Sequence, residues 1–189
     1  MSALRMVILG RQGSGKGTQS LRICEAHGCI HVSTGDMLRS AVAQGTELGL
    51  QASKIMDAGG LVSDEIMNGI VAERFSHSDV SERGVLLDGF PRTVDQANAL
   101  EGILEGLSLD LRIALNLDVP IEIVTQRMLD RRREDDTPEA IRRRLELYET
   151  ETAPLLDWFT SRDLLSTVDG VGAEDEVFAR IDAAITARN

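Results

Sequence analysis

The sequence is poor in aromatic residues and has no long apolar run. Tryptophan, tyrosine and phenylalanine make up only 3% of its 189 residues, while 42% are hydrophobic, so the core must be built mainly from Leu, Ile, Val, Met and Ala. A chain of this length predicts one domain with inserted lobes rather than two independent domains. Without an apolar run long enough to cross a bilayer, we expect no membrane-spanning helix.

Positive charge is also scarce. The formal net charge is −11, and only two of the 20 basic residues, Lys16 and Lys54, are lysines. Nucleic-acid binding needs a broadly basic face, and an anionic membrane surface repels an acidic protein, so we expect neither partner. The N-terminus lacks the regions of a signal peptide, which favours a cytoplasmic protein.

Two cysteines are present, Cys24 and Cys29. Their C-x4-C spacing has no second Cys or His pair that would complete a zinc site. We therefore expect no zinc and two reduced, partly buried thiols.

Short apolar segments alternate with longer helical patterns along the chain. The nearly continuous apolar content of these segments is typical of strands buried on both faces, and strands separated by helices predict an α/β fold with a five-stranded parallel sheet flanked by helices. Ligands bind such sheets beyond the carboxyl ends of the strands. The predicted strands are 4–10, 29–33, 84–89, 112–119 and 164–170, and the predicted helices are 16–27, 36–43, 47–58, 64–75, 93–104, 121–132, 138–150 and 173–188.

A glycine-rich loop joins the first predicted strand to the first predicted helix. It reads GRQGSGK from Gly10 to Lys16, with the G-x4-G-K spacing of a phosphate-binding loop. The glycines let successive N–H groups turn inward around a phosphate, and the following helix presents its positive end to the same anion. Lys16 adds a point charge for the β- and γ-phosphates. The alternative, a glycine-rich turn with a solvated lysine, is disfavoured by the strand–loop–helix context.

The loop continues as GSGKGTQ, with Gly17 after the lysine and the hydroxyl of Thr18 one position later than usual. In this feature the chain resembles the P-loop nucleoside monophosphate kinases, the adenylate kinases above all, and the resemblance covers residues 5–188. It implies a P-loop core with a helical monophosphate-binding lobe at 33–62 and a short lid loop at 130–136. It also implies that the ATP phosphates are held by Gly13, Ser14, Gly15, Lys16, Gly17 and Thr18.

The octapeptide VSTGDMLR, residues 32–39, resembles the monophosphate-binding segment of this family. The resemblance implies that Thr34 hydrogen-bonds the adenine of AMP, that Arg39 binds its phosphate, and that the backbone of Gly60, Leu61 and Val62 lines the adenine pocket. Relatives often carry Lys at position 60, but a backbone contact should survive the change. The alternative for the octapeptide is a capped helix with a surface arginine.

A second motif, LLDGFPRT, ends the third predicted strand at residues 86–93. Asp88 stands where a carboxylate can hold a water on Mg²⁺, and Arg92 can bind a phosphate through two parallel hydrogen bonds. A tight strand-to-helix turn without a ligand is the alternative. The AMP-binding residues that the resemblance implies here are Gly89, Phe90, Pro91, Arg92 and the adenine-reading Gln96.

Arginines cluster on both sides of the segment REDDT, between residues 127 and 144. Such clusters are often solvated surfaces, but as a set they resemble the phosphate-clamping helices of the family. The resemblance implies that Arg127 and Arg131 face ATP and that Arg133 and Arg144 reach the phosphates being exchanged. The resemblance gives weaker support for a phosphate-binding role of Arg132, Arg142 and Arg143. The brevity of REDDT matches the short-lid bacterial type, and backbone near Gly172 is implied to face the ATP adenine.

The predicted reaction is ATP + AMP ⇌ 2 ADP. The predicted cofactor is Mg²⁺, bound as its complex with ATP, and the predicted partners are ATP, AMP and ADP. We expect the protein to act as a monomer. Phosphoryl transfer depends on positioning and charge neutralisation, so we expect no nucleophile and no general base. The residues predicted to act in catalysis are Lys16, Arg92, Arg131, Arg133 and Arg144.

Three other functions are weighed against this one. A UMP or CMP kinase is disfavoured by Thr34 and Gln96, because pyrimidine-directed relatives typically carry Ala at the former position. A GTP-dependent AMP kinase stays open, since contacts to the donor base are mostly from the backbone. A nucleotide-dependent switch module is disfavoured by the absence of an N-K-x-D motif.

Arg11-Gln12 departs from the family, whose bacterial members usually carry Pro-Pro in these positions. Proline would stiffen the loop. Two interpretations are open at this point: a more flexible loop, or an added charge from Arg11 near the phosphates.

Overall fold

The computed structural model describes residues 3–57, 60–131 and 136–188 and is built around a parallel β-sheet. The strands lie in the order β2-β3-β1-β4-β5, so the strand that leads into the glycine-rich loop is central. Each predicted strand is confirmed to within one residue at either end, and the α/β class is confirmed. The strands are β1 (Leu4–Leu9), β2 (Ile30–Ser33), β3 (Gly84–Asp88), β4 (Ile113–Asp118) and β5 (Leu165–Asp169).

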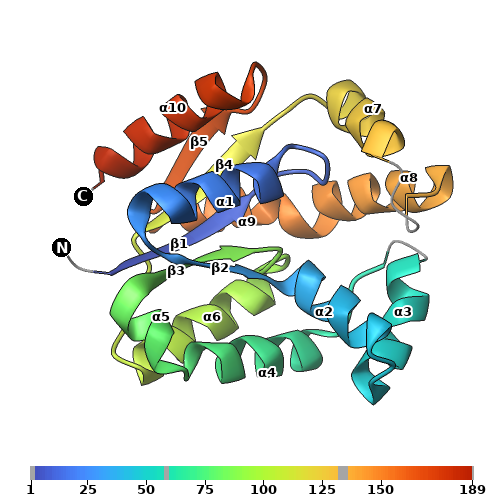
Figure 1. Cartoon of the computed structure of the whole chain (residues 1–189), viewed down its shortest axis with the longest axis horizontal. Helices are drawn as coiled ribbons and strands as arrows, with labels where there is room; N and C mark the ends of the chain where they lie inside the picture. The colour runs from blue at the N-terminus through green and yellow to red at the C-terminus, as the bar shows by residue number, and fades with distance from the viewer. Residues whose placement is uncertain (1–2, 58–59, 132–135, 189) are drawn as a thin grey trace.

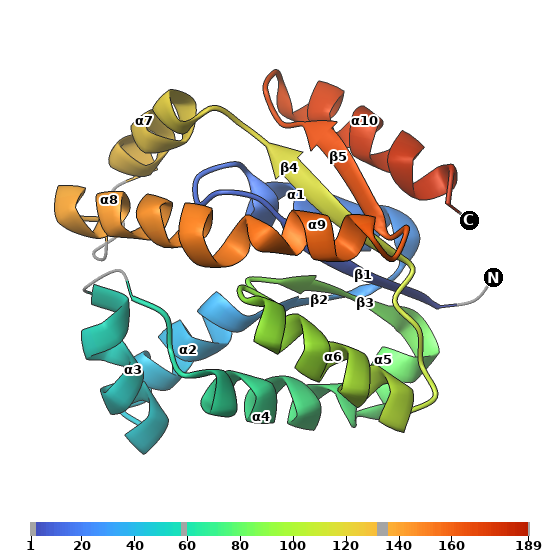
Figure 2. The ribbon, with the colours of Figure 1, turned by 180° about the vertical axis from the view of Figure 1, so that it is seen from behind.

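Helices cover both faces of the sheet (Figures 1 and 2). Side chains of β1 alternate between the faces: Met6 and Ile8 pack with α1 and α10, whereas Val7 and Leu9 pack with α4, α6 and α9. This double coverage explains why the strands are nearly continuous in apolar residues. The helices described are α1 (Lys16–His27), α2 (Thr34–Ala43), α3 (Glu47–Asp57), α4 (Asp64–Phe75), α5 (Ser78–Arg83), α6 (Val94–Gly106), α7 (Ile121–Arg131), α8 (Pro138–Leu147), α9 (Pro154–Thr160) and α10 (Glu174–Thr186).

Helices α5 and α9 are absent from the sequence-based prediction, because both are too short to show a clear helical period. The helix predicted at 138–150 also differs, because its α-helical part ends at Leu147 and continues as a π-helical turn, η1 (Tyr148–Thr152). In η1 the N–H of Ala153 donates to the carbonyl of Tyr148 at 2.7 Å. Pro154 follows directly, and because proline has no N–H it cannot continue the α-helical ladder.

The two cysteines meet at the end of α1. Gly28 adopts φ 71° and donates its N–H to the carbonyl of Cys24, which ends the helix. The chain reversal brings the Sγ atoms of Cys24 and Cys29 to 3.1 Å, in the position where a capping motif places its apolar contact. Both thiols are free; Cys24 is partly buried, as expected, whereas Cys29 is buried.

The carboxyl ends of the strands lie between two pairs of helices, α2 with α3 and α7 with α8 (Figures 1 and 2). Helices α2 and α3 pack against each other within the segment 33–62, whose role as a monophosphate-binding lobe stays a prediction. Most of the predicted lid loop at 130–136, including Arg132 and Arg133, lies outside the described residues. Within the described ranges, no helix has the length and apolar character needed to span a membrane.

Candidate functional site

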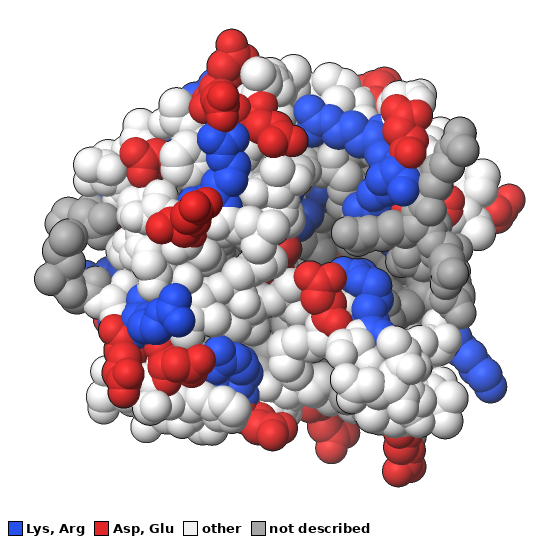
Figure 3. All heavy atoms as spheres, viewed as in Figure 1, with Lys and Arg blue, Asp and Glu red and all other residues white. Residues whose placement is uncertain are grey.

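A cavity of about 700 Å³ opens at the carboxyl ends of the strands, within the usual size range of ligand pockets. Figure 3 shows Lys and Arg side chains along the hollowed part of this face. The cavity gathers residues from every motif singled out in the sequence. The predicted site residues that line it are Gly13, Ser14, Gly15, Lys16, Gly17, Thr18, Arg39, Gly60, Leu61, Val62, Asp88, Gly89, Pro91, Arg92, Gln96, Arg127, Arg131, Arg144 and Gly172.

Three predicted residues are not placed on the cavity wall. Thr34 is 1% exposed, and its hydroxyl lies 3.4 Å from the carbonyl of Asp88, to which it donates. Phe90 is buried in the core on the α4–α6 side of the sheet. Arg133 lies outside the described residues. Thr34 and Phe90 therefore lie just behind the wall, where they support the turn at Asp88.

The glycines of the phosphate loop leave its backbone N–H groups accessible and also let the loop pack closely against neighbouring elements. Gly10 and Gly13 have φ values of 136° and 86°, which disfavour residues with side chains. A Cβ on Gly10 would lie 2.6 Å from the carbonyl oxygen of Leu117, and one on Gly13 would lie 2.7 Å from that of Val124. The loop is thus pressed against the end of β4 and against α7.

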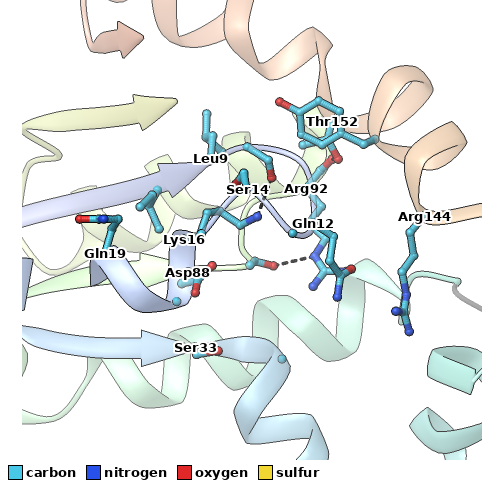
Figure 4. Close-up of a pocket in the computed structure, with 18 of the residues that line it drawn as sticks. Leu9, Gln12, Ser14, Lys16, Gln19, Ser33, Asp88, Arg92, Arg144 and Thr152 are labelled. Atoms are coloured by element: carbon cyan, nitrogen blue, oxygen red, sulfur yellow. Dashed lines mark hydrogen bonds between the residues drawn. The ribbon is translucent and has the colours of Figure 1, made fainter. Parts of the chain in front are cut away.

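Lys16 curls back into the loop that precedes it (Figure 4). Its Nζ donates to the carbonyls of Gly10 and Arg11 at 2.6 and 2.9 Å. Burial lowers the pKa of Lys16 to about 8; Asp88 opposes this shift, while Arg92 and Arg131 add to it. An anion placed among these cations would relieve their repulsion.

Asp88 ends β3 at the cavity wall, and its carboxylate lies 3.5 Å from Nε2 of His31. A partly buried carboxylate oxygen next to a phosphate loop suits Mg²⁺, which typically takes one or two protein carboxylates together with substrate phosphates and waters. The residues present therefore fit a magnesium ion that arrives with a nucleotide. Within the described residues, no group of three or more His, Cys, Asp and Glu side chains is arranged to hold a metal.

Arg92 follows the β3 turn and reaches into the cavity (Figure 4). Its Nε donates to the carbonyl of Gly89 at 2.9 Å, and its backbone N–H donates to Oε1 of Gln96 at 2.8 Å. Burial lowers the pKa of Arg92, Asp88 opposes the shift, and Arg144 and Arg39 reinforce it. The Gln96 amide also donates to Asp64 at 2.7 Å, which fixes its orientation.

Two further arginines share one buried carboxylate. The Asp136 side chain is 0% exposed and accepts from Nε of Arg131 at 2.6 Å and from Nη1 of Arg144 at 3.0 Å. The Arg144 side chain is 10% exposed. Since a buried carboxylate holds guanidinium groups in a fixed orientation, Asp136 aims both arginines. Sequence reasoning missed it, although its place in the run of three acidic residues between the arginine clusters was a usable signal.

Arg39 and Arg127 approach the cavity from opposite sides. Arg39 pairs with Asp36 in the first turn of α2, where the hydroxyl of Ser33 caps the helix. Arg127 on α7 donates to the carbonyl of Ser14 at 3.3 Å. Arginines from α2, from the turn after β3, and from α7 and α8 thus line the same cavity as the phosphate loop.

Several lining residues were assigned no role from the sequence. Gln12, Gln19, Tyr148 and Thr152 all contribute to the wall. Tyr148 and Thr152 come from η1, which periodicity alone does not reveal. Gln19 faces the Gly172 region, where its side-chain amide donates to the carbonyl of Glu174 at 3.0 Å.

The arrangement suits transfer of a group between two anionic ligands, and comparison with known proteins agrees. A family model described as adenylate kinase matches residues 8–164. The adenylate kinase of Stenotrophomonas maltophilia strain K279a is 50% identical over 188 residues, which cover 97% of this chain and 100% of that protein. The adenylate kinase of Mycobacteroides abscessus is 48% identical over 182 residues, covering 96% and 99%. That of Xylella fastidiosa strain 9a5c is 47% identical over 186 residues, again covering 96% and 99%.

Proposed function

Because this chain belongs to the adenylate kinase family and catalyses ATP + AMP ⇌ 2 ADP, we propose that its cavity holds both nucleotides, with their phosphates meeting between Lys16 and Arg92. The observation that supports this most directly is the convergence of cations from four elements around one phosphate loop. A protein that only bound ATP would not need arginines directed at a second phosphate position.

On the donor side, we assign the ATP phosphates to the backbone and side chains of the loop. Lys16 would exchange its two loop carbonyls for phosphate oxygens, which match its charge better. Arg127 and Arg131 would face the same phosphates, and backbone near Gly172 would contact the adenine. The loop residues concerned are Gly13, Ser14, Gly15, Lys16, Gly17 and Thr18.

On the acceptor side, Arg39 and Arg92 would bind the AMP phosphate, with Arg133 and Arg144 reaching the group in transit. The phosphate would take the place of Asp36 as the partner of Arg39. The backbone of Gly60, Leu61 and Val62 would form the adenine pocket, and Thr34, which lies just behind the wall, would turn its hydroxyl from the carbonyl of Asp88 toward the base. The remaining acceptor-site residues are Gly89, Phe90, Pro91 and Gln96.

Magnesium is part of the proposal, since adenylate kinases act on the magnesium complex of ATP. Asp88 would hold it through a water. When bound, Mg²⁺ neutralises charge on the β- and γ-phosphate oxygens. We propose no zinc site.

Catalysis in this cavity would be positioning and charge stabilisation. The acceptor oxygen of AMP is already anionic, so neither a nucleophile nor a general base is required. Lys16, Arg131 and Arg144 would stabilise charge that spreads over the moving phosphoryl group. Since Asp136 holds Arg131 and Arg144 in place beforehand, these two arginines need little reorganisation during transfer.

We further propose that the chain acts as a monomer in the cytoplasm. One chain supplies cations to both phosphate positions, so no second copy is needed to complete the site. Free thiols such as Cys24 and Cys29 suit a reducing compartment.

A single assay tests the proposal. The protein is mixed with magnesium and ATP or GTP, together with AMP, UMP or CMP in turn, and the diphosphate products are separated. ADP should form from ATP and AMP, with far less product from the pyrimidine nucleotides. Absence of product with AMP would refute the assignment, and equal rates with GTP would favour the broader donor range.

Replacing Thr34 with Ala should reduce the preference for AMP over CMP by about tenfold, measured as the ratio of kcat/KM values, because a buried hydroxyl that bonds the base discriminates between bases. Thr160→Ala is the matched control, because its hydroxyl bonds only within α9. An unchanged ratio in Thr34→Ala would mean that Thr34 does not read the base.

The kcat/KM for ATP should fall as the pH rises above about 8. Burial favours the neutral amine of Lys16, so the free protein loses this charge as the pH passes the lowered pKa of about 8. The matched variant is Lys16→Arg, whose guanidinium stays protonated and whose profile should lack this decline whatever its absolute rate. A decline of the same shape in both proteins would assign the titration to another group.

A further inference from the structure

Arg11 belongs to the phosphate loop, but its side chain does not line the cavity. The guanidinium turns toward η1 instead, where Nε donates to Oε1 of Glu149 at 2.8 Å, across 138 residues of sequence. Nη1 donates to the carbonyl of Val119 at 3.2 Å, and Asp118 lies within 3.5 Å. The guanidinium also lies over the ring of Tyr148, 5.3 Å from its centroid, within the range of a cation–π contact.

The backbone of Arg11 is hydrogen-bonded to the part of the loop that contains Ser14 and Lys16. Its carbonyl accepts from Nζ of Lys16 at 2.9 Å and from the N–H of Ser14 at 3.1 Å. The residue whose side chain is attached to η1 is therefore the one whose carbonyl holds Lys16 before a nucleotide binds. A shift of the Arg11 backbone would move both hydrogen bonds together.

The segment that receives Arg11 is connected to the other half of the site. Tyr148 and Glu149 follow α8 directly, and the N–H of Tyr148 donates to the carbonyl of Arg144. At the far end of η1, the hydroxyl of Thr152 donates to the carbonyl of Arg92 at 2.8 Å. Short π-helical segments are frequent at functional sites, and this one contacts the phosphate loop at one end and the Arg92 turn at the other.

We propose that Arg11 is a positioning residue for phosphoryl transfer: by binding Glu149 and Tyr148 it fixes the phosphate loop, and Lys16 with it, relative to Arg144 and Arg92. This inference rests on the proposed function of the cavity. It answers the question left by the missing Pro-Pro pair, because a side-chain anchor to η1 replaces the stiffness that proline would give the loop.

Two features of Arg11 distinguish a positioning role from that of a direct phosphate ligand or of a stabilising surface ion pair. A direct phosphate ligand would point into the cavity, whereas this guanidinium already has two carboxylates and a carbonyl as partners outside it. An ordinary surface ion pair contributes little to stability, and the Glu149 side chain is 44% exposed. The main effect of removing the contact should thus be on the placement of the loop.

The test compares Arg11→Ala, Glu149→Ala and the double variant in steady-state assays with ATP and AMP varied separately. Arg11→Ala should raise the KM for ATP about tenfold, since a misplaced loop binds phosphate poorly, and leave the KM for AMP within about twofold. Glu149→Ala should act in the same direction. The double variant should be no worse than Arg11→Ala alone, because both changes break one connection. Arg11→Lys should recover most of the ATP affinity.

The control is Arg22→Ala, since Arg22 also pairs with a carboxylate and lies over an aromatic ring, Asp175 and Phe178, but away from the loop. It should leave both KM values unchanged. The proposal fails if Arg11→Ala behaves like Arg22→Ala, or if Glu149→Ala is neutral while Arg11→Ala is not, which would make Arg11 a direct ligand. Absence of ADP formation by the unmodified chain would instead refute the proposed function.

Discussion

Lys16→Met should lower kcat by about 10³-fold or more, the scale on which a charged group that stabilises a transferring phosphoryl group contributes. Lys16 is the lysine of the phosphate loop, and its ammonium is held by two loop carbonyls at the cavity wall. Methionine keeps much of the side-chain volume while removing the charge. The rate of ADP formation with both nucleotides saturating measures this loss directly.

The same substitution should leave the fold intact. Because burial lowers the pKa of Lys16 from 10.5 to about 8, its charged form is less favourable in the folded than in the unfolded chain. That cost is fully present below the folded-state pKa and fades as the pH rises toward the ordinary value. Methionine removes it, so the thermal midpoint at neutral pH should be unchanged or higher.

Lys54→Met is the matched control, since Lys54 is the only other lysine and is exposed on α3. Its kcat should equal that of the unmodified chain. Near-normal turnover in Lys16→Met, or an equal loss in Lys54→Met, would remove the phosphate loop from the mechanism.

Arg92→Ala should lower kcat/KM for AMP by about 10³-fold, because a guanidinium that binds a phosphate through two hydrogen bonds supplies both charge and orientation. The KM for ATP should change far less, since Arg92 follows β3 on the side of the cavity that we propose for AMP. Arg92→Lys should recover little, because an ammonium cannot form the paired hydrogen bonds. Separate titrations of ATP and AMP distinguish these effects.

Arg162→Ala provides the comparison for Arg92. Arg162 lies over the Trp158 ring at 3.6 Å and pairs with Glu101, outside the cavity, so its loss should leave both nucleotide parameters unchanged. The turn at Arg92 should survive its own substitution, since the bonds from Thr152 and to Gln96 use the backbone of Arg92. Equal losses for ATP and AMP would show that Arg92 supports the whole site rather than the acceptor.

Local patterns predicted the sheet and most of the cavity wall. The strands could be found because each is apolar over its whole length, and the phosphate loop because G-x4-G-K encodes one local backbone shape. Sequence patterns could not predict the short helices α5 and α9, since six or seven residues carry no reliable period. They could not predict the π-helical turn η1 either, since its register is set by packing.

Spacing along the chain thus determined the α/β fold, the glycine-rich loop and the family, and it predicted the AMP-binding motifs, because each of these patterns lies within one short segment of the chain. Tertiary structure alone decided that Thr34 and Phe90 lie behind the cavity wall, that Asp136 aims Arg131 and Arg144, and that Arg11 binds Glu149 rather than a phosphate. Partners such as Arg11 and Glu149, 138 residues apart, meet only when the sheet brings the ends of distant strands and helices together. An arginine in a sequence shows that a charge is available, and only the fold determines which anion it meets.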